Sequence, residues 1–290
     1  MERTDKNTVK RAVPLRPDDA NKGTMGSLLS VCGCYGMAGA AILSGRAALR
    51  SGLGLLKSAL PESIYPIVAS AVPESVFYPL SQSGRALSAD NLPALLEYAA
   101  GSRAVMIGCG LSVCADTRAI VRGMLASCRV PILLDADALN CIAGEPELLR
   151  GAAAPAVVTP HPAEMGRMIG KTAAEVNSAR IQTAARFAEE YGAVTLLKGA
   201  GTVIASPDGR LVLNTTGNSG MATGGSGDVL SGIIGALLAQ GAEPFDAAAA
   251  GAYLHGLAGD LAAERLGRTS MLPGDIIDEL PGAFMRCGIK

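Results

Sequence analysis

The chain has 290 residues, of which 49% are hydrophobic and 18% charged, and its net charge is −1. This composition excludes a disordered chain and allows one large α/β domain or two smaller ones. The near-zero charge, the lack of Trp and the 3% aromatic content argue against nucleic-acid and anionic-membrane partners.

We predict that residues 1–22 form a polar lead-in, because this segment mixes four acidic residues with its bases, unlike the start of a signal peptide. Residues 23–45 carry no charge, and a membrane span needs about 20 apolar residues. Six glycines keep the hydrophobicity of this stretch modest, so we expect a buried strand at 27–33 instead. A single domain is then expected over residues 23–290.

Apolar runs alternate with helical patterns along the rest of the chain. The predicted strands are 27–33, 103–107, 130–134, 156–159 and 193–197. The predicted helices are 37–51, 90–100, 113–126, 173–190, 228–240 and 246–266. Because the strand runs are continuous, both sheet faces should be covered, which predicts an α/β fold with a doubly wound, mostly parallel sheet and helices on both faces. Residues 202–214 differ, since the turn sequence Ser206-Pro207-Asp208-Gly209 predicts a small β-hairpin.

Ligands of open α/β sheets bind at the carboxyl ends of the strands. Polar or glycine-rich clusters follow the predicted strands at Gly33–Gly39, Gly108–Gly110, Asp135–Asn140, Thr159–Glu164 and Lys198–Thr202. Their shared position predicts one site at this edge of the sheet.

Two apparent phosphate motifs fail. "GRMIGKT", residues 166–172, has three residues between its glycines where a P-loop needs four, and it follows a helical pattern. The dinucleotide fingerprint begun by Gly108 and Gly110 has Val113 where its last glycine belongs.

"GGSGD", Gly224 to Asp228, leads into a predicted helix and is a better anion site. Glycine backbone can turn its N–H groups around an anion, and the helix dipole adds roughly half a positive charge there. Asp228 is then either a stabilising carboxylate at a helix N-terminus or a base beside bound phosphate. Gly232 and Gly235, inside the helix, predict a close neighbour on that face.

Seven cysteines at irregular spacings, with only two histidines, predict reduced thiols in a cytoplasmic protein. His161 lies between two prolines after a strand, which favours a ligand contact, whereas His255 beside a leucine stripe favours packing or hydrogen bonding. Asp135 either caps the following helix or belongs to the site. Lys198 lies between a strand and a glycine loop, which favours a phosphate contact over a solvated lysine.

The stretch "NTTGNSGMATGGSGDVLSGIIG", residues 214–235, resembles the signature of ADP- or ATP-dependent NAD(P)H-hydrate dehydratases, which belong to the ribokinase-like superfamily near hydroxyethylthiazole kinase. Supporting segments are "KGTMGSLLSVCGCYGMAGAAILSGRAALRSGLGLL" (22–56), "IGCGL" (107–111), "LLDADALN" (133–140), "TPHPAEMGRM" (159–168) and "LLKGAGTVI" (196–204). The resemblance runs from about Lys22 to Leu280 and implies a ribokinase-like fold.

The resemblance implies a metabolite-repair reaction on NADH or NADPH hydrated on the nicotinamide ring (S form). The ring hydroxyl would be phosphorylated from ADP or ATP, and phosphate would then be eliminated to restore the dihydropyridine. A small-molecule kinase of the same superfamily is the alternative, and a nucleotide-sensing module without turnover is a second one. The presence of Asp228 argues against the sensor, because binding alone needs no base.

Matching the family's motifs residue by residue implies the following roles. Asp228 resembles the catalytic base and also contacts the hydrated cofactor, together with Ala40, Gly110 and His161. The donor nucleotide would be bound by Lys198, Gly199, Ala200, Gly201, Thr202, Gly225, Ser226 and Gly227. Mg²⁺ would bridge the donor phosphates, with Glu164 and Asp135 as candidate contacts through water.

Three positions depart from the family's usual residues. Cys109 and Ser219 stand where proline is usual, and Ser112 stands where glycine is usual. Cys109 and Ser112 lie in one loop at the substrate end and contact neither Asp228 nor Lys198 in this expectation. We therefore expect them to affect substrate affinity rather than the reaction itself. The resemblance also implies ADP as the usual bacterial donor and a symmetric homo-oligomer, often a tetramer; we expect no epimerase domain within these residues.

Overall fold

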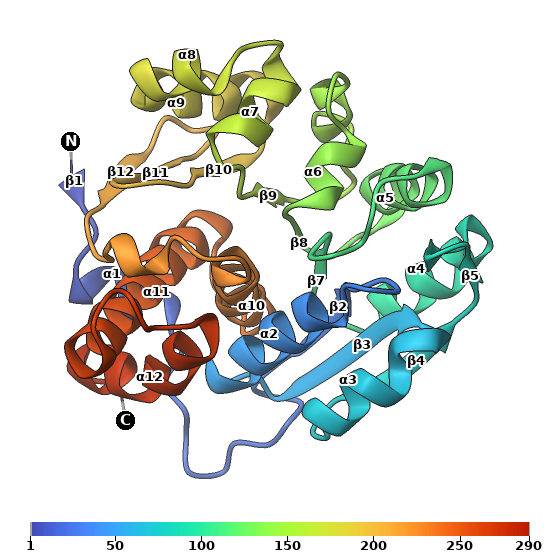
Figure 1. Cartoon of the computed structure of the whole chain (residues 1–290), viewed down its shortest axis with the longest axis horizontal. Coiled ribbons are helices and arrows are strands. Elements are labelled where there is room, and N and C mark those ends of the chain that lie inside the picture. The colour runs from blue at the N-terminus through green and yellow to red at the C-terminus, as the bar shows by residue number, and fades with distance from the viewer. Residues whose placement is uncertain (1, 290) are drawn as a thin grey trace.

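The computed structural model describes residues 2–289. In it, ten strands form one sheet in the order β1-β12-β11-β10-β9-β8-β7-β2-β3-β4 (Figure 1). The strands are β1 (Glu2–Arg3), β2 (Ser27–Val31), β3 (Leu55–Pro61), β4 (Val76–Leu80), β7 (Ala104–Ile107), β8 (Ile132–Leu134), β9 (Ala156–Val158), β10 (Val194–Leu197), β11 (Thr202–Ala205) and β12 (Leu211–Asn214). From β10 to β4 all neighbours are parallel, as expected for a doubly wound sheet.

Helices cover both faces of the sheet, and each face has its own apolar core (Figure 1). One core includes side chains of α1 (Lys6–Ala12), α2 (Ala38–Arg50), α3 (Tyr65–Ala71), α10 (Ser226–Ala239), α11 (Pro244–Leu266) and α12 (Pro273–Arg286). The other includes α4 (Leu92–Ala100), α5 (Ala115–Ser127), α6 (Asp137–Cys141), α7 (Pro162–Ile169), α8 (Ala173–Ser178) and α9 (Arg180–Tyr191). None of the helices in residues 2–289 has both the length and the apolar character needed to cross a membrane.

All five predicted strands are confirmed as β2, β7, β8, β9 and β10. The predicted hairpin is confirmed as β11 and β12, which pair antiparallel, but it extends the main sheet instead of standing apart. A separate two-stranded antiparallel sheet is formed by β5 (Gln82–Ser83) and β6 (Ala86–Leu87).

The helix predicted over 173–190 is broken in the structure. Ala179 leaves the helical conformation, with φ −138° and ψ 40°, and separates α8 from α9. The break places Arg180 at the start of α9, where its guanidinium donates to the carbonyl oxygens of Leu197 (3.0 Å) and Gly201 (3.2 Å). A tertiary contact thus overrides the local helical pattern.

The polar lead-in contains two ordered elements. Strand β1 pairs in parallel with β12, and Asp5 caps α1 by accepting from the backbone N–H of Thr8 at 2.9 Å. Val9 and Ala12 of α1 are buried and α1 packs on α11. The segment therefore completes one edge of the main sheet.

The close neighbour expected beside α10 is helix α2. A Cβ on Gly232 would overlap the carbonyl oxygen of Ser44, and a Cβ on Gly235 would lie 3.0 Å from Leu28. These glycines let α10 approach α2 and the sheet closely. Their packing fixes the N-terminal end of α10 above the carboxyl ends of the central strands.

Candidate active site

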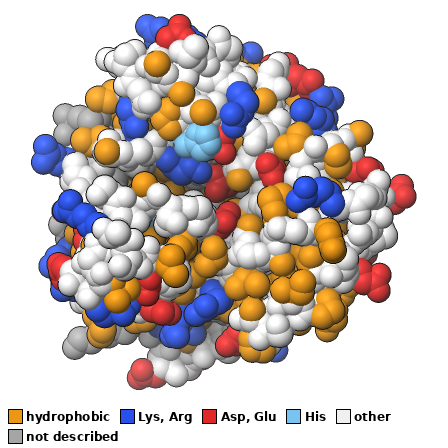
Figure 2. Space-filling view, viewed as in Figure 1, with side chains coloured by type: hydrophobic (Ala, Val, Ile, Leu, Met, Phe, Trp, Pro, Cys, Tyr) orange, Lys and Arg blue, Asp and Glu red, His pale blue; other side chains and the backbone are white. Residues whose placement is uncertain are grey.

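Charged side chains from separate strand ends meet beside the N-terminus of α10. Asp135 follows β8, Glu164 lies in the first turn of α7 and Lys198 follows β10. The Lys198 ammonium lies 2.7 Å from Oδ1 of Asp135 and 3.8 Å from Oε2 of Glu164. Figure 2 shows acidic, basic and histidine side chains gathered near the centre of this face of the molecule. The predicted site at the carboxyl edge of the sheet is therefore present as a cluster.

Asp135 is an anchor for Lys198 and not a helix cap. It is 1% exposed, and its Oδ2 accepts a hydrogen bond from the Ser231 hydroxyl at 2.7 Å. The helix that follows has no side-chain cap. Burial alone would raise the pKa of Asp135, but the charge and hydrogen bond of Lys198, together with hydrogen bonds from Ser231 and Thr159, outweigh burial and lower this pKa. The carboxylate is thus held ionised beneath α10.

Lys198 remains a cation in this setting. Burial opposes its charge, but the Asp135 and Glu164 carboxylates outweigh burial and raise the pKa of Lys198. A Cβ on Gly227 would lie 3.5 Å from the Lys198 Nζ, so the ammonium lies directly beside the glycine loop of α10. A fixed positive charge therefore sits next to the proposed anion site.

The loop before α10 is shaped for an anion. Gly225 has φ +96°, a conformation that favours glycine, and it precedes the first helical residue, Ser226. Within residues 2–289, the N–H groups of Gly225, Gly227 and Asp228 donate to no acceptor. Unpaired N–H groups at a helix N-terminus are suited to phosphate oxygens.

Asp228 lies in the first turn of α10 and carries a strongly perturbed carboxyl group. Burial and the nearby Asp135 carboxylate raise the pKa of Asp228 to about 7, while the Cys109 thiol and the Lys198 ammonium act in the opposite direction. A carboxyl group that exchanges its proton near neutral pH is well matched to general-base catalysis. A plain helix-terminal carboxylate would have no reason to be desolvated in this way.

His161 caps α7 and faces the cluster. Its Nδ1 accepts from the backbone N–H groups of Ala163 (3.1 Å) and Glu164 (3.3 Å), so the ring proton lies on Nε2. Burial, together with the positive charges of Lys198 and Arg167, lowers the pKa of His161. A neutral, half-exposed imidazole with a defined donor atom can orient a polar ligand.

The predicted substrate residues Ala40 and Gly110 lie against each other. Gly110 has φ +63°, and a Cβ there would lie 2.8 Å from the Cβ of Ala40. The loop after β7 thereby reaches the first turn of α2. These two residues form a side of the site distinct from Lys198.

The remaining predicted nucleotide residues form the turn between β10 and β11. Gly199 and Gly201 both have positive φ, at +146° and +72°, and a Cβ on Gly199 would overlap the Arg180 guanidinium. Arg180 was not predicted as a site residue, because its place inside an amphipathic helical pattern concealed its role. It fixes the shape of this turn through Leu197 and Gly201.

His255 is a hydrogen-bonding residue beside the site, in agreement with the sequence interpretation. Its Nε2 lies 3.3 Å from the Ser226 hydroxyl oxygen. Burial lowers the pKa of His255 to about 4, so the ring is neutral at physiological pH. It links α11 to the first residue of α10.

The structure changes the interpretation of Cys109. This residue is fully buried, and its thiol acts on the pKa of Asp228, so it is not confined to a substrate loop. Ser112 has a left-handed conformation, with φ +70°, and its N–H donates to Asp137 at 2.8 Å. Ser219 begins the short helix η4 (Ser219–Met221), a first-turn position that also suits proline.

The donor atoms near the site do not form a direct metal centre. Both oxygens of Asp135 already accept hydrogen bonds, and Oε2 of Glu164 accepts from the His161 N–H at 2.8 Å. Among the described residues, no group of three or more His, Cys, Asp or Glu side chains is arranged to hold a metal ion. A divalent ion here fits only when most of its ligands are phosphate and water.

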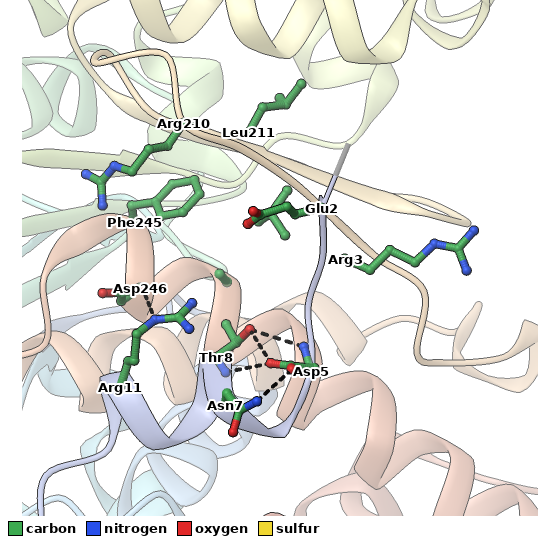
Figure 3. A pocket seen from close by; sticks show the side chains of 12 residues that line it. Glu2, Arg3, Asp5, Asn7, Thr8, Arg11, Arg210, Leu211, Phe245 and Asp246 are labelled. Carbon is green, nitrogen blue, oxygen red and sulfur yellow. Dashed lines mark hydrogen bonds and ion pairs between the residues drawn. The ribbon is translucent and has the colours of Figure 1, made fainter.

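A separate cavity of about 710 Å³ lies between β1, α1, β12 and α11 (Figure 3). Two of its arginines are engaged: Arg11 lies 3.5 Å from Asp246, and the Arg210 guanidinium lies 4.6 Å from the centre of the Phe245 ring while pairing with Glu243 outside the lining. None of the predicted site residues lines it. We assign it no role in the chemistry of the cluster.

Known proteins resemble this chain over most of its length. The sequence profile described as NAD(P)H-hydrate dehydratase matches residues 28–282. The bifunctional NAD(P)H-hydrate repair enzyme Nnr of Moorella thermoacetica is 47% identical over 93% of this chain and 51% of its own length. The ADP-dependent (S)-NAD(P)H-hydrate dehydratase of Neisseria meningitidis is 39% identical over 90% of this chain and 86% of its own length.

A solved structure shows the same similarity. The ADP/ATP-dependent NAD(P)H-hydrate dehydratase of Bacillus subtilis, crystallised with ATP and Mg²⁺, has a TM-score of 0.84 and 31% identity, covering 99% of this chain and 98% of its own. A hydroxyethylthiazole kinase of Pyrococcus horikoshii, with 15% identity and a TM-score of 0.58, shares the fold alone. The chain spans about half the length of the bifunctional relatives that it matches.

Proposed function

This chain belongs to the NAD(P)H-hydrate dehydratase family, and on that premise we propose that it returns the S form of hydrated NADH or NADPH to the intact dinucleotide. The phosphoryl donor is ADP, with ATP as the alternative. The overall reaction removes water from the nicotinamide ring, and the enzyme is a carbon–oxygen lyase that repairs a damaged cofactor.

The observation that carries the proposal is Asp228, a carboxyl group with a pKa raised to about 7 next to an anion-binding helix N-terminus. Asp228 takes the proton of the ring hydroxyl, and the resulting oxygen attacks the terminal phosphorus of the donor. The O–P bond to the donor breaks, leaving AMP from ADP. The ring nitrogen lone pair then expels phosphate, and loss of a proton from the neighbouring carbon restores the dihydropyridine.

The donor phosphates are held by Lys198 and by the free N–H groups of Gly225, Gly227 and Asp228. The turn from Gly199 to Thr202 contacts the rest of the donor. Glu164 and Asp135 would hold a Mg²⁺ ion through water, and the ion would supply charge neutralisation to the donor phosphates. Ala40, Gly110 and His161 line the side that receives the hydrated ring.

The proposal includes two properties of the whole protein. All seven cysteines are free thiols, which supports a reducing compartment such as the cytoplasm. A symmetric homo-oligomer, expected to be a tetramer, is proposed from the family resemblance and is tested by light scattering on the purified protein.

Phosphorus NMR separates the dehydratase from a small-molecule kinase. With hydrated NADH, Mg²⁺ and ADP, the dehydratase releases AMP and inorganic phosphate in equal amounts. A kinase would instead accumulate a stable phosphate ester. Accumulation of such an ester from the hydrate, without restored NADH, would contradict the elimination step.

A further inference from the structure

The site has a second end that the proposed chemistry does not use. The sheet order runs from β10 through β8 and β7 to β2 and β3. The donor residues follow β10, the N-terminus of α10 that carries the base lies beside Asp135 at the end of β8, and Gly110 and Ala40 come after β7 and β2. The loop between β2 and α2 therefore borders the end of the site away from the donor residues, and the rest of a dinucleotide held at Asp228 by its nicotinamide ring would extend across it.

That loop carries an exposed aromatic side chain, and an exposed cation from another segment of the chain lies beside it. Tyr35 is 64% exposed, although its backbone N–H is fixed by a 2.9 Å hydrogen bond to the carbonyl oxygen of Arg85. Arg85 lies in the turn between β5 and β6, and a Cβ on Gly36 would lie 3.4 Å from its guanidinium. The two side chains thus come from segments that are distant in sequence but joined at the rim of the site.

The rim is held in place by buried neighbours. Ala86 and Leu87 of β6 are buried and pack against β3 and α5, so the turn that carries Arg85 is anchored. No ion pair among residues 2–289 includes Arg85. The Arg85 guanidinium stands on this anchored turn beside the Cys34 thiol, and without a carboxylate partner it can pair with phosphate. The exposed phenol ring of Tyr35 offers a flat surface to a base.

We propose that Arg85 and Tyr35 bind the adenosine half of the substrate, with Arg85 on the ribose 2′-phosphate and Tyr35 against the adenine. This inference rests on the proposed function. The consequence is a preference for hydrated NADPH over hydrated NADH, since only NADPH carries the 2′-phosphate. Arg85 is then a specificity-determining residue that takes no part in the phosphoryl transfer.

The test compares the two dinucleotides in wild type, Arg85→Ala, Arg85→Lys and Tyr35→Phe. Arg85→Ala should lower kcat/KM for hydrated NADPH by about 10- to 100-fold and change that for hydrated NADH by less than about threefold. Arg85→Lys should recover part of the lost kcat/KM for hydrated NADPH. Tyr35→Phe keeps the aromatic ring and should retain binding of both dinucleotides. Arg129→Ala is the matched control, because Arg129 is exposed and precedes β8, at the amino ends of the parallel strands and opposite the site.

A calorimetric titration with intact NADPH and NADH separates this inference from the proposed function, because it needs no turnover. If Arg85→Ala binds NADPH more weakly than wild type but binds NADH equally well, the inference is supported. That holds even if the wild type dehydrates neither hydrate, because missing dehydration would overturn only the proposed function. Equal losses for both dinucleotides, or no loss for NADPH, overturn the inference while leaving observed dehydration intact.

Discussion

The ammonium of Lys198 lies 2.7 Å from Oδ1 of Asp135, a carboxylate that is only 1% exposed. Ser231 holds the other oxygen of Asp135 at 2.7 Å. A lysine that would otherwise sample many rotamers is thereby fixed beside Gly227, at the loop proposed to bind phosphate. The ion pair joins the end of β10 to the end of β8 and to α10, so it organises the proposed donor side of the site.

Replacing Lys198 should weaken nucleotide binding and destabilise the fold. Lys198→Ala removes a point charge from the phosphates, and we expect the KM for ADP to rise about 10- to 100-fold. It also leaves Asp135 buried without a counter-charge, which costs about 3–5 kcal/mol of unfolding free energy. Steady-state kinetics and urea denaturation measure the two effects.

The double variant Lys198→Met with Asp135→Asn separates these effects. It removes the buried charge together with its partner, so the free energy of unfolding should recover while the KM for ADP stays high. An unchanged KM for the nucleotide in Lys198→Ala would refute the donor-binding role.

Replacing Asp228 should affect turnover far more than binding. Asp228→Asn keeps the shape of the side chain but removes the base, so kcat should fall by about 10²–10⁴-fold. The Kd for ADP, measured by calorimetry, should change by only a few-fold. Equal losses in kcat and in ADP affinity would instead indicate that Asp228 acts as a ligand for the donor.

The pH dependence of kcat/KM should report the Asp228 carboxyl group. Because its pKa is raised to about 7 and the base must be ionised, kcat/KM should fall about tenfold per pH unit below pH 7. Activity should level off at higher pH. A profile that stays flat down to pH 5 would contradict the assignment.

Cys109 should affect the pH below which kcat/KM falls. Its thiol lowers the pKa of Asp228, so Cys109→Ala should raise this pKa, and kcat/KM should begin to fall at a higher pH than in wild type. Cys128→Ala is a control, because Cys128 is also buried but lies after α5 with its thiol near the Val130 carbonyl. If the fall of kcat/KM moves to lower pH in Cys109→Ala, or moves to higher pH in the control as well, the thiol does not act on Asp228.

Ser112 should be a strained position. At φ +70° the Cβ of a serine causes steric strain that a glycine would not have. Ser112→Gly should therefore raise the unfolding free energy by about 0.5–1 kcal/mol. Its backbone hydrogen bond to Asp137 is unaffected by the change. Thermal unfolding measures this gain, and a loss of stability would mean that the serine side chain itself stabilises the loop.

Much of the fold was accessible from local patterns. The five central strands are continuous apolar runs, and α10 begins where "GGSGD" predicts it. The strands β3 and β4 were missed, because "LLKSALP" and "VFYPL" carry a lysine or a proline that weakens the apolar signal. Pro79 is tolerated in β4, since this strand lies at the edge of the sheet.

The site was predictable in its parts but not in its electrostatics. The glycine loop and Asp228 follow from composition and helical spacing, and the family resemblance added Ala40, Gly110 and His161. No local pattern could show that Ser231, 96 positions from Asp135, donates to that carboxylate. The same holds for Arg180 and Cys109, whose roles depend on contacts between segments that only the folded chain brings together.

The most direct test is recovery of dihydronicotinamide absorbance when purified protein meets hydrated NADH, Mg²⁺ and either ADP or ATP. Wild type should restore the absorbance with at least one nucleotide, ADP being expected to serve better, and Asp228→Asn should restore almost none in the same time. Failure of the wild type with both nucleotides, or full recovery by Asp228→Asn, would contradict the proposal that this site dehydrates the cofactor by phosphoryl transfer.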